Sequence, residues 1–282
     1  MTCDPVEITV LVDDQAGEGL ASEHGLSLWI AAGKRRILFD TGQGAVLAPN
    51  ARRLGVPLEE TETVVLSHGH YDHTGGLGDV LTSAPGANLV LHPDATATRY
   101  SVGPSRTARS IGMPEDVRVL VERMPCDKVT WSDRPVNLAS HIGVTGPIAR
   151  RTSFERSRGP FFLDGHGQLQ DPITDDQALW IATPTGLVVC VGCCHAGLVN
   201  TLDHVRRVTG VFEVRAVLGG FHLTSANSQR LRQTIEALRT IAPDLVVPCH
   251  CTGQRAVGLL QEAFGDRVSG CRSGAVYRFG SR

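Results

Sequence analysis

The chain has 282 residues, of which 41% are hydrophobic and 20% are charged, so it contains enough apolar material for a large core and too little charge for disorder. Its formal net charge of −2 at pH 7 gives no positive field to attract nucleic acid or an anionic membrane. Because αβ folds of this length commonly form one continuous domain, we expect a single domain over residues 1–282.

The N-terminus and the cysteines indicate the compartment. The first seven residues lack the basic and apolar regions of a signal peptide, and no apolar run approaches the length of a membrane span. Four of the eight cysteines occur in two close pairs beside histidines, Cys193 with Cys194 and Cys249 with Cys251, and are not spread as a disulfide framework. We therefore expect a cytoplasmic protein whose cysteines are thiols or metal ligands.

Apolar runs of strand length alternate with helical patterns through the first part of the chain. Strands are expected at residues 7–12, 26–31, 36–40, 63–67 and 88–92, and helices at 44–54 and 75–81. The middle, from about residue 99 to 176, is rich in Pro, Gly, Arg and Ser, so we expect mostly loops there, with short strands at 117–121 and 136–139. A stretch of this kind commonly forms a lid or one wall of a substrate site.

Regular patterns return in the last hundred residues. A hairpin is expected from strands at 178–183 and 187–191, with further strands at 214–218, 245–247 and 275–279 and helices at 197–208, 228–241 and 253–264. Both halves of the chain therefore consist of strands followed by alternating strands and helices. This order predicts an α/β fold in which two sheets pack between layers of helices.

Four residues of metal-ligand type lie within six positions, directly after the predicted strand at 63–67: His68, His70, Asp72 and His73. Imidazole nitrogens and a carboxylate suit borderline divalent metals such as zinc. Ligands this close on a tight loop can point to two sides, so we expect His68 and His70 to hold one ion and Asp72 and His73 to hold a neighbour. A water-facing polar loop is the alternative, and four such residues after a buried strand rarely gather by chance.

One such cluster supplies too few ligands for two ions, and further candidates follow other predicted strands. His195 and Cys193 follow the strand at 187–191, and the Cys193 thiolate could bridge two ions or simply pack as a small buried side chain. His250 follows the strand at 245–247 and is expected to be a ligand. Since side chains alternate along a strand, Cys249 and Cys251 should then point away from the metals.

Three more residues are expected to act at the site. His222 comes after the strand at 214–218 and two glycines, and it could be a metal ligand, a substrate contact or a histidine of the core. Together with Asp72 it is also a candidate catalytic residue. His24 precedes the strand at 26–31 and could reach the substrate, or it could be a turn histidine. Asp40 ends a strand and is expected to orient a ligand histidine through a hydrogen bond, with a turn-forming aspartate as the alternative.

These motifs resemble the metallo-β-lactamase superfamily, above all in the His-x-His-x-Asp-His signature. Within it, the chain looks like the branch that includes dihydropterin ribofuranosyl-aminobenzene phosphate synthases. The resemblance implies an αββα sandwich with metals at one edge between the two sheets. It covers essentially the whole chain through Glu23-His24-Gly25-Leu26-Ser27, Phe39-Asp40-Thr41-Gly42, Ser67-His68-Gly69-His70-Tyr71-Asp72-His73-Thr74-Gly75-Gly76, Gly192-Cys193-Cys194-His195-Ala196-Gly197, Gly219-Gly220-Phe221-His222-Leu223 and His250-Cys251-Thr252-Gly253.

Two positions depart from the common pattern of the superfamily. Cys193 stands where an aspartate is usual, and the usual mid-chain Gly-His-Thr turn has only a loose counterpart around His141, so His195 is a candidate to replace its histidine. These departures leave open whether one or two ions bind, and they argue against β-lactam hydrolysis.

The metal site leads to several hypotheses about function. A divalent ion, zinc in the first place with manganese or iron as alternatives, lowers the pKa of bound water from about 15.7 towards about 7 and polarises a carbonyl or phosphoryl oxygen. Our first hypothesis is hydrolysis of a small phosphorylated, ester or lactone substrate by metal-bound hydroxide. Arginines of the loop-rich middle could bind an anionic substrate or could be solvated surface: Arg99, Arg106, Arg109, Arg150 and Arg151.

Other classes of function remain open. The family resemblance implies a pterin-type transferase or synthase as the second hypothesis, and an iron-binding redox or sensor module is the third. A non-catalytic binding protein is disfavoured because all four residues of the metal cluster are intact, and a nuclease because the chain has no basic surplus. The oligomeric state does not follow from the sequence.

Overall fold

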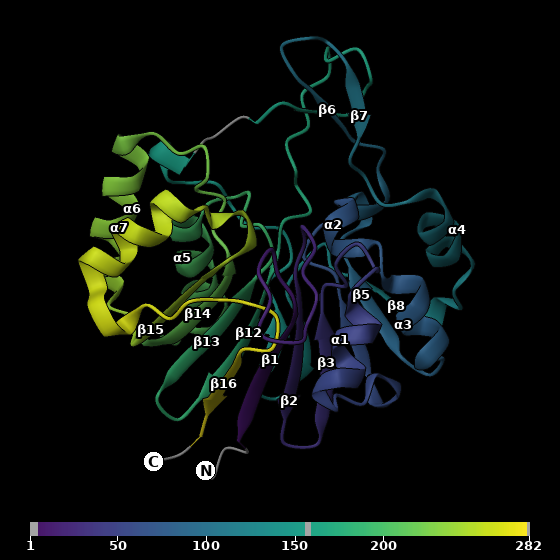
Figure 1. Cartoon of the computed structure of the whole chain (residues 1–282), viewed down its shortest axis with the longest axis horizontal. Helices are drawn as coiled ribbons and strands as arrows, with labels where there is room; N and C mark the ends of the chain where they lie inside the picture. Colours follow the sequence, from purple (N-terminus) through teal and green to yellow (C-terminus); the bar gives the residue numbers. More distant parts are fainter. Residues whose placement is uncertain (1–4, 156–158, 281–282) are drawn as a thin grey trace.

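Two β-sheets face each other at the centre of the computed structural model, which describes residues 5–155 and 159–280, and helices cover both outer faces (Figure 1). The first sheet has the strand order β16 (Val276–Phe279), β1 (Val6–Val12), β2 (Ser27–Ala32), β3 (Arg35–Phe39), β4 (Thr63–Val65), β5 (Asn88–Leu91) and β8 (Val129–Trp131). The second has the order β15 (Leu245–Cys249), β14 (Val214–Gly220), β13 (Gly186–Val191), β12 (Ala178–Thr183), β10 (Ile142–Val144) and β9 (Val136–Ala139).

Each sheet combines antiparallel and parallel pairs. In the first sheet, β3, β4, β5 and β8 run parallel to one another, and in the second the parallel strands are β13, β14 and β15. The carboxyl ends of neighbouring parallel strands lie at the same edge of a sheet, which is where ligands bind in many αβ folds. The candidate site residues follow these strands, so the topology brings them towards one another.

The helices pack on the outer faces of the sheets (Figure 1). One side has α1 (Leu47–Leu54), α2 (Tyr71–Thr74), α3 (Leu77–Ser83) and α4 (Glu115–Arg123), and the other has α5 (Leu198–Thr209), α6 (Ser228–Ile241) and α7 (Gln254–Phe264). Sequence explains local boundaries: the Asn227 side chain accepts a hydrogen bond from the Arg230 backbone N–H at the start of α6, and Gly55 takes a left-handed conformation after α1.

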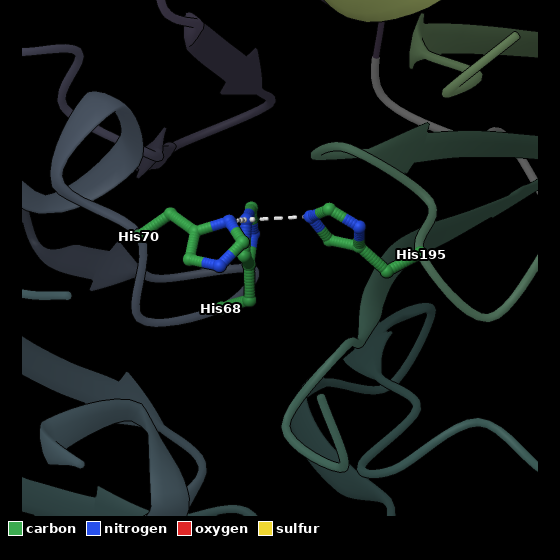
Figure 2. A group of neighbouring side chains, drawn as sticks. All are labelled: His68, His70 and His195. Carbon is green, nitrogen blue, oxygen red and sulfur yellow. Dashed lines mark hydrogen bonds between the residues drawn. The ribbon is translucent and has the colours of Figure 1, made fainter. Parts of the chain in front are cut away.

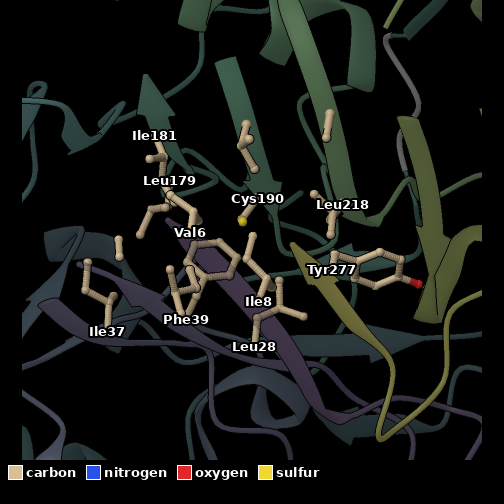
Figure 3. Packing of buried hydrophobic residues seen from close by; sticks show 14 of the residues in the cluster. Val6, Ile8, Leu28, Ile37, Phe39, Leu179, Ile181, Cys190, Leu218 and Tyr277 are labelled. Atoms are coloured by element: carbon tan, nitrogen blue, oxygen red, sulfur yellow. The ribbon is translucent and has the colours of Figure 1, made fainter. Parts of the chain in front are cut away.

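The core between the sheets consists of side chains from both of them. Figure 3 shows Ile8 and Leu28 of the first sheet facing Cys190 and Leu218 of the second. Two further apolar clusters fill the spaces between each sheet and its helices. Strand β13, for example, is therefore buried on both faces, which explains why its sequence is continuously apolar after Gly186. The predicted αββα sandwich is confirmed.

The middle of the chain is more regular than the sequence indicates. It forms part of both large sheets and a small sheet of β11 (Phe161–Phe162), β6 (Tyr100–Val102) and β7 (Ala108–Ser110), which lies at the top of Figure 1. The predicted strand at 117–121 is wrong, because these residues belong to α4. Val117 and Val121 are four residues apart and both buried, which is the spacing of one helix face.

Within the described ranges, the structure contains no helix that is both long and apolar enough to cross a membrane.

Candidate metal centre

Candidate ligands from both sheets meet at one edge of the sandwich. His68, His70 and His195 form the first group, with His68 and His70 on the loop after β4 and His195 on the loop after β13 (Figure 2). His68 Nε2 lies 2.9 Å from His70 Nδ1 and 3.3 Å from His195 Nε2. All three side chains are buried. Zinc–nitrogen bonds of about 2.0–2.1 Å in a tetrahedron separate two nitrogens by about 3.3 Å, so these spacings suit one ion.

The first group is held in the form that binds metals. Burial, followed by the charges of neighbouring histidines, keeps the pKa of His68 and of His195 well below the ordinary value. Burial, followed by the charge of Arg99, lowers the pKa of His70 to about 3. Neutral imidazole is the form that coordinates a metal. His70 Nδ1 is the nitrogen next to His68 Nε2, so in the metal-binding form of this ring the proton is on Nε2, which is buried without a hydrogen-bond partner.

Asp72, His73, His250 and Cys193 form a second group beside the first. Asp72 Oδ2 lies 3.3 Å from His250 Nε2 and 3.8 Å from His73 Nε2. His73 Nε2 lies 3.3 Å from Cys193 Sγ. Cys193 is also close enough to His68 and to His195 to share an ion with either. The thiol therefore lies between the two groups, where it could contribute to either site.

Asp40, directly after β3, orients the loop that contains His68 to His73. Its Oδ2 lies 2.7 Å from His73 Nδ1 and accepts a hydrogen bond of 2.7 Å from Ser67 Oγ, while its Oδ1 accepts one of 2.7 Å from the Ser67 backbone N–H. Burial alone would lower the pKa of His73, but Asp40 and Asp72 raise it above the ordinary value. The hydrogen bond to Asp40 points His73 Nε2 at the second group.

His222 lies next to the first group, and His24 lies next to the second. The His222 ring centre is 4.5 Å from that of His195, and its Nδ1 is buried without a hydrogen-bond partner. The His24 side chain is 53% exposed, and its Nε2 lies 3.3 Å from Asp72 Oδ2. Both histidines line a cavity of about 490 Å³ whose floor includes His70, Asp72 and His195.

The expectation that Cys251 points away from the metals is wrong. Strand β15 ends at Cys249, and His250–Thr252 is a turn of 3₁₀ helix, so side chains no longer alternate there. Cys251 Sγ lies within 4.8 Å of candidate ligand atoms of Cys193 and His250. Cys249 does face another way, towards Asp13 and Cys271.

Arg99 is buried in an ion pair, which neither alternative from the sequence, a substrate contact or a solvated surface residue, predicts. It is 1% exposed, and its guanidinium donates two hydrogen bonds to Asp175, of 2.7 and 2.8 Å, and lies 2.9 Å from Asp171. Asp175 Oδ2 also accepts a hydrogen bond of 2.7 Å from the backbone N–H of Gly69. The buried ion pair therefore supports the loop that contains His68 and His70.

Other predicted residues are placed by the structure as follows. Arg109 lines the cavity, with its guanidinium 5.5 Å from the centre of the Tyr71 ring. His141 lies in the β9–β10 turn, where its carbonyl accepts from the Ala182 backbone N–H, at the opposite end of β12 from the site. It is therefore not a counterpart of the usual mid-chain histidine. Cys194 packs in the core beneath α5.

Sequence analysis missed Asp13 and Asp14, which directly follow β1. Asp13 Oδ1 accepts from the His250 backbone N–H at 2.8 Å, and Asp14 Oδ1 lies 2.6 Å from His250 Nδ1. Their position after an apolar strand is the same signal that identified Cys193 and His222. It was present in the sequence.

A family model described as the metallo-beta-lactamase superfamily matches residues 23–250, which include both groups of candidate ligands: His68, His70, Asp72, His73, Cys193, His195 and His250. The chain belongs to the metallo-β-lactamase superfamily. Strands β1 (Val6–Val12) and β16 (Val276–Phe279) lie outside the matched residues and complete the first sheet.

Known relatives span nearly the whole of this superfamily member. A 7,8-dihydropterin-6-methyl-4-(β-D-ribofuranosyl)-aminobenzene-5'-phosphate synthase of Methanocaldococcus jannaschii is 30% identical, over 98% of this chain and 97% of its own. The crystal structure of Tm1679, a metal-dependent hydrolase of the β-lactamase superfamily, is 31% identical with a TM-score of 0.81, over 98% and 100% of the two chains. YhfI from Bacillus subtilis, a metallo-β-lactamase fold protein, is 15% identical over 98% and 100% of the chains with a TM-score of 0.60, and shares the fold.

Proposed function

We propose that this protein is a metal-dependent hydrolase of a small phosphorylated, ester or lactone substrate. The observation that carries the proposal is a set of histidine, aspartate and cysteine side chains that converge on the floor of an open cavity. His250 Nε2 is buried there without a hydrogen bond, 3.3 Å from Asp72 Oδ2, a costly arrangement unless a cation occupies the space between it and its neighbours. The residues present therefore fit the divalent metal that the superfamily implies.

Two groups of residues would hold metal. His68, His70 and His195 would hold one ion, and Asp72, His73 and His250 a second, with Cys193 between them. A bound divalent ion supplies Lewis acidity, which activates water and polarises the substrate oxygen. We propose zinc, because the mixture of imidazole, thiol and carboxylate suits this metal; manganese and iron are alternatives.

The chain's own residues would bind the substrate and move protons. Burial would raise the pKa of Asp72, but the charges of His73 and His250 hold it below its ordinary range, so Asp72 is an ionised acceptor at the cavity floor. His222 lines the cavity with an unpaired Nδ1, from which a proton could pass to a leaving group. Arg109, over the Tyr71 ring at the cavity wall, provides a positive charge for a phosphate or carboxylate.

The test combines metal analysis with a panel of phosphomonoesters, phosphodiesters, lactones and thioesters. We expect at least one metal ion per chain in the wild type, and loss of about 100-fold or more of the hydrolytic activity in His70→Ala. The matched control is His141→Ala, at the far end of the sandwich, which should keep both metal and activity. A wild type without metal, or a His70→Ala variant with full activity, would refute the proposal.

A second candidate function is transferase or synthase chemistry at the same site. The synthase of Methanocaldococcus jannaschii, which is 30% identical along nearly the full length of both chains, favours it. The relative Tm1679, 31% identical, is described as a hydrolase and favours the first proposal. Incubation with a dihydropterin whose 6-methylene carbon carries a diphosphate leaving group, together with an aminobenzene ribofuranosyl 5'-phosphate, separates the two. Only a synthase would join this carbon to the aniline nitrogen and release diphosphate.

A further inference from the structure

The loop between β1 and β2 holds His24 against the metal loop. Beside it, the Glu23 carboxylate accepts hydrogen bonds of 2.9–3.2 Å from the backbone N–H groups of residues 43–45. On its other side, Gly25 has φ of 155°, and a Cβ at this position would lie 2.5 Å from the Asp72 carbonyl oxygen. Only glycine therefore allows this close approach. These two anchors fix His24 beside Asp72 although its side chain is half-exposed.

Three imidazoles surround one oxygen of Asp72. Asp72 Oδ2 lies 3.3 Å from His24 Nε2, 3.3 Å from His250 Nε2 and 3.8 Å from His73 Nε2. The ring centres of His24 and His250 are 4.5 Å apart. His24 thus has the same relation to this carboxylate as His250, which the sequence predicts to be a ligand.

A carboxylate also holds the other nitrogen of each of these rings. His73 Nδ1 lies 2.7 Å from Asp40, His250 Nδ1 lies 2.6 Å from Asp14, and His24 Nδ1 lies 3.1 Å from the second oxygen of Asp14. A carboxylate only accepts hydrogen bonds, so in the neutral rings the proton is on Nδ1. Each Nε2 then presents a lone pair.

In the neutral rings these lone pairs face one another and the Asp72 oxygen, an arrangement that a metal ion or a proton between them stabilises. His250 Nε2 is buried and makes no hydrogen bond, which is the same signature of a missing partner. Hydrogen bonding of the outer nitrogen to a carboxylate is the usual arrangement for a histidine that binds a metal. A substrate contact would not require this orientation of His24 towards Asp72.

We infer that His24 is a ligand of the second metal ion, and that Asp14 orients both His24 and His250 for this ion. The inference rests on the proposed metal-dependent function and adds a residue from the β1–β2 loop to the second group. Three imidazole nitrogens and one carboxylate oxygen form a donor set that suits zinc. His24 then has a metal-binding role in place of the substrate contact suggested by the sequence.

The test measures metal binding directly. Wild type, His24→Ala and Asp14→Asn are stripped with a chelator and titrated with Zn²⁺ by calorimetry, with elemental analysis after dialysis. We expect two ions in the wild type. His24→Ala should bind the first ion normally and the second about 10–100-fold or more weakly, and Asp14→Asn should also weaken the second ion about 10–100-fold. His141→Ala, which removes an imidazole far from the site, is the matched control and should bind both ions as the wild type does.

Three results would contradict this inference, and they differ in what they say about the proposed function. A His24→Ala variant with two ions of unchanged affinity would show that His24 is not a ligand, while the metal-dependent function would stand. A wild type that binds only one ion would remove the second site and leave a one-metal enzyme. A wild type that binds no ion would overturn the proposed function as well. Circular dichroism of each variant verifies that it is folded.

Discussion

At the scale of single residues, the two halves of the site differ in the charges that surround them. Burial, with neighbouring histidines and arginines as the next causes, lowers the pKa values of His68, His70 and His195. His73 and His250 lie against carboxylates and the Cys251 thiol, and despite burial their pKa values are raised. Because a divalent ion competes with protons for these nitrogens, the first group is more ready to accept a metal near neutral pH.

Asp176, next to the site, provides a prediction about pH. It is buried, accepts a hydrogen bond of 2.6 Å from the Ala196 backbone N–H, and burial raises its pKa to about 6. A raised carboxyl pKa means that the folded state binds the proton more tightly than the unfolded state, so stability falls as pH rises from about 4 to above 6. We expect Asp176→Asn to remove this loss, since the amide oxygen can still accept from Ala196.

The measurement is urea unfolding of wild type and Asp176→Asn at pH 4, 5, 6 and 7 with chelator present, so that metal binding adds no pH dependence. The free energy of unfolding of the variant should gain about 3 kcal/mol relative to the wild type between pH 4 and 7. A difference between the two proteins that stays constant over this range would show that Asp176 titrates normally.

The same scale shows which parts of the site could be predicted. His68, His195 and His250 could be predicted because each is a residue of ligand type that follows a predicted apolar strand. The position of Cys251 was predicted wrongly because side chains alternate only within a strand. The 3₁₀ turn after Cys249 changes the direction of each side chain. A hydrogen bond such as that between Asp14 and His250 joins residues 236 positions apart, and no local pattern specifies it.

At the scale of elements, the segment before β12 connects the two loops that contain the candidate ligands. Asp175 accepts from the Gly69 backbone N–H, Asp176 from that of Ala196, and the Gln177 side chain donates to the Leu66 carbonyl at 2.8 Å. This connection was not predictable, because the weak periodicity of residues 99–176 gives no partner for a loop. Regular elements such as α6, at Ser228–Ile241, were predicted to the residue because their apolar face repeats along the helix.

Arg99 is the buried partner on which this segment depends. Replacing it with alanine would leave the Asp171 and Asp175 carboxylates without their cation in a buried place. Removal of one partner from a buried ion pair typically costs about 3–5 kcal/mol, so we expect Arg99→Ala to lower the free energy of unfolding by that amount. Because Asp175 also holds Gly69, we expect weaker metal binding in the same variant.

Chemical denaturation at pH 7 measures the first effect, and Arg118→Ala is the control. Arg118 forms its ion pairs with Glu115 and Glu122 on the exposed face of α4, where water screens the charges, so its loss should leave the midpoint almost unchanged. Equal midpoints for Arg99→Ala and Arg118→Ala would mean that the Arg99 network contributes nothing to stability.

At the scale of the whole molecule, the site forms only where the two sheets approach each other. The order of the layers could be predicted from the alternation of strands and helices in the sequence, because each apolar face must be buried against another element. The distance between the edges of the two sheets could not be predicted from this alternation. That distance is set by contacts such as Gly192, after β13 of the second sheet, which lies directly against Ser67 and Asp40 of the first.

Gly192 therefore tests whether the closeness of the two sheets matters for the site. A Cβ at this position would overlap Ser67 Oγ and lie 3.0 Å from Asp40 Oδ2, so Gly192→Ala must push apart the residues that orient His73. We expect metal affinity to fall about 10–100-fold, as for loss of an orienting partner, with a loss of stability of about 1–3 kcal/mol from overpacking. Gly78→Ala, in α3 with its nearest neighbour 4.0 Å away, is the control and should be neutral or slightly stabilising. If zinc titration and urea unfolding give the same values for Gly192→Ala as for wild type, the sheets have room to separate at this edge, and the site does not depend on their close contact.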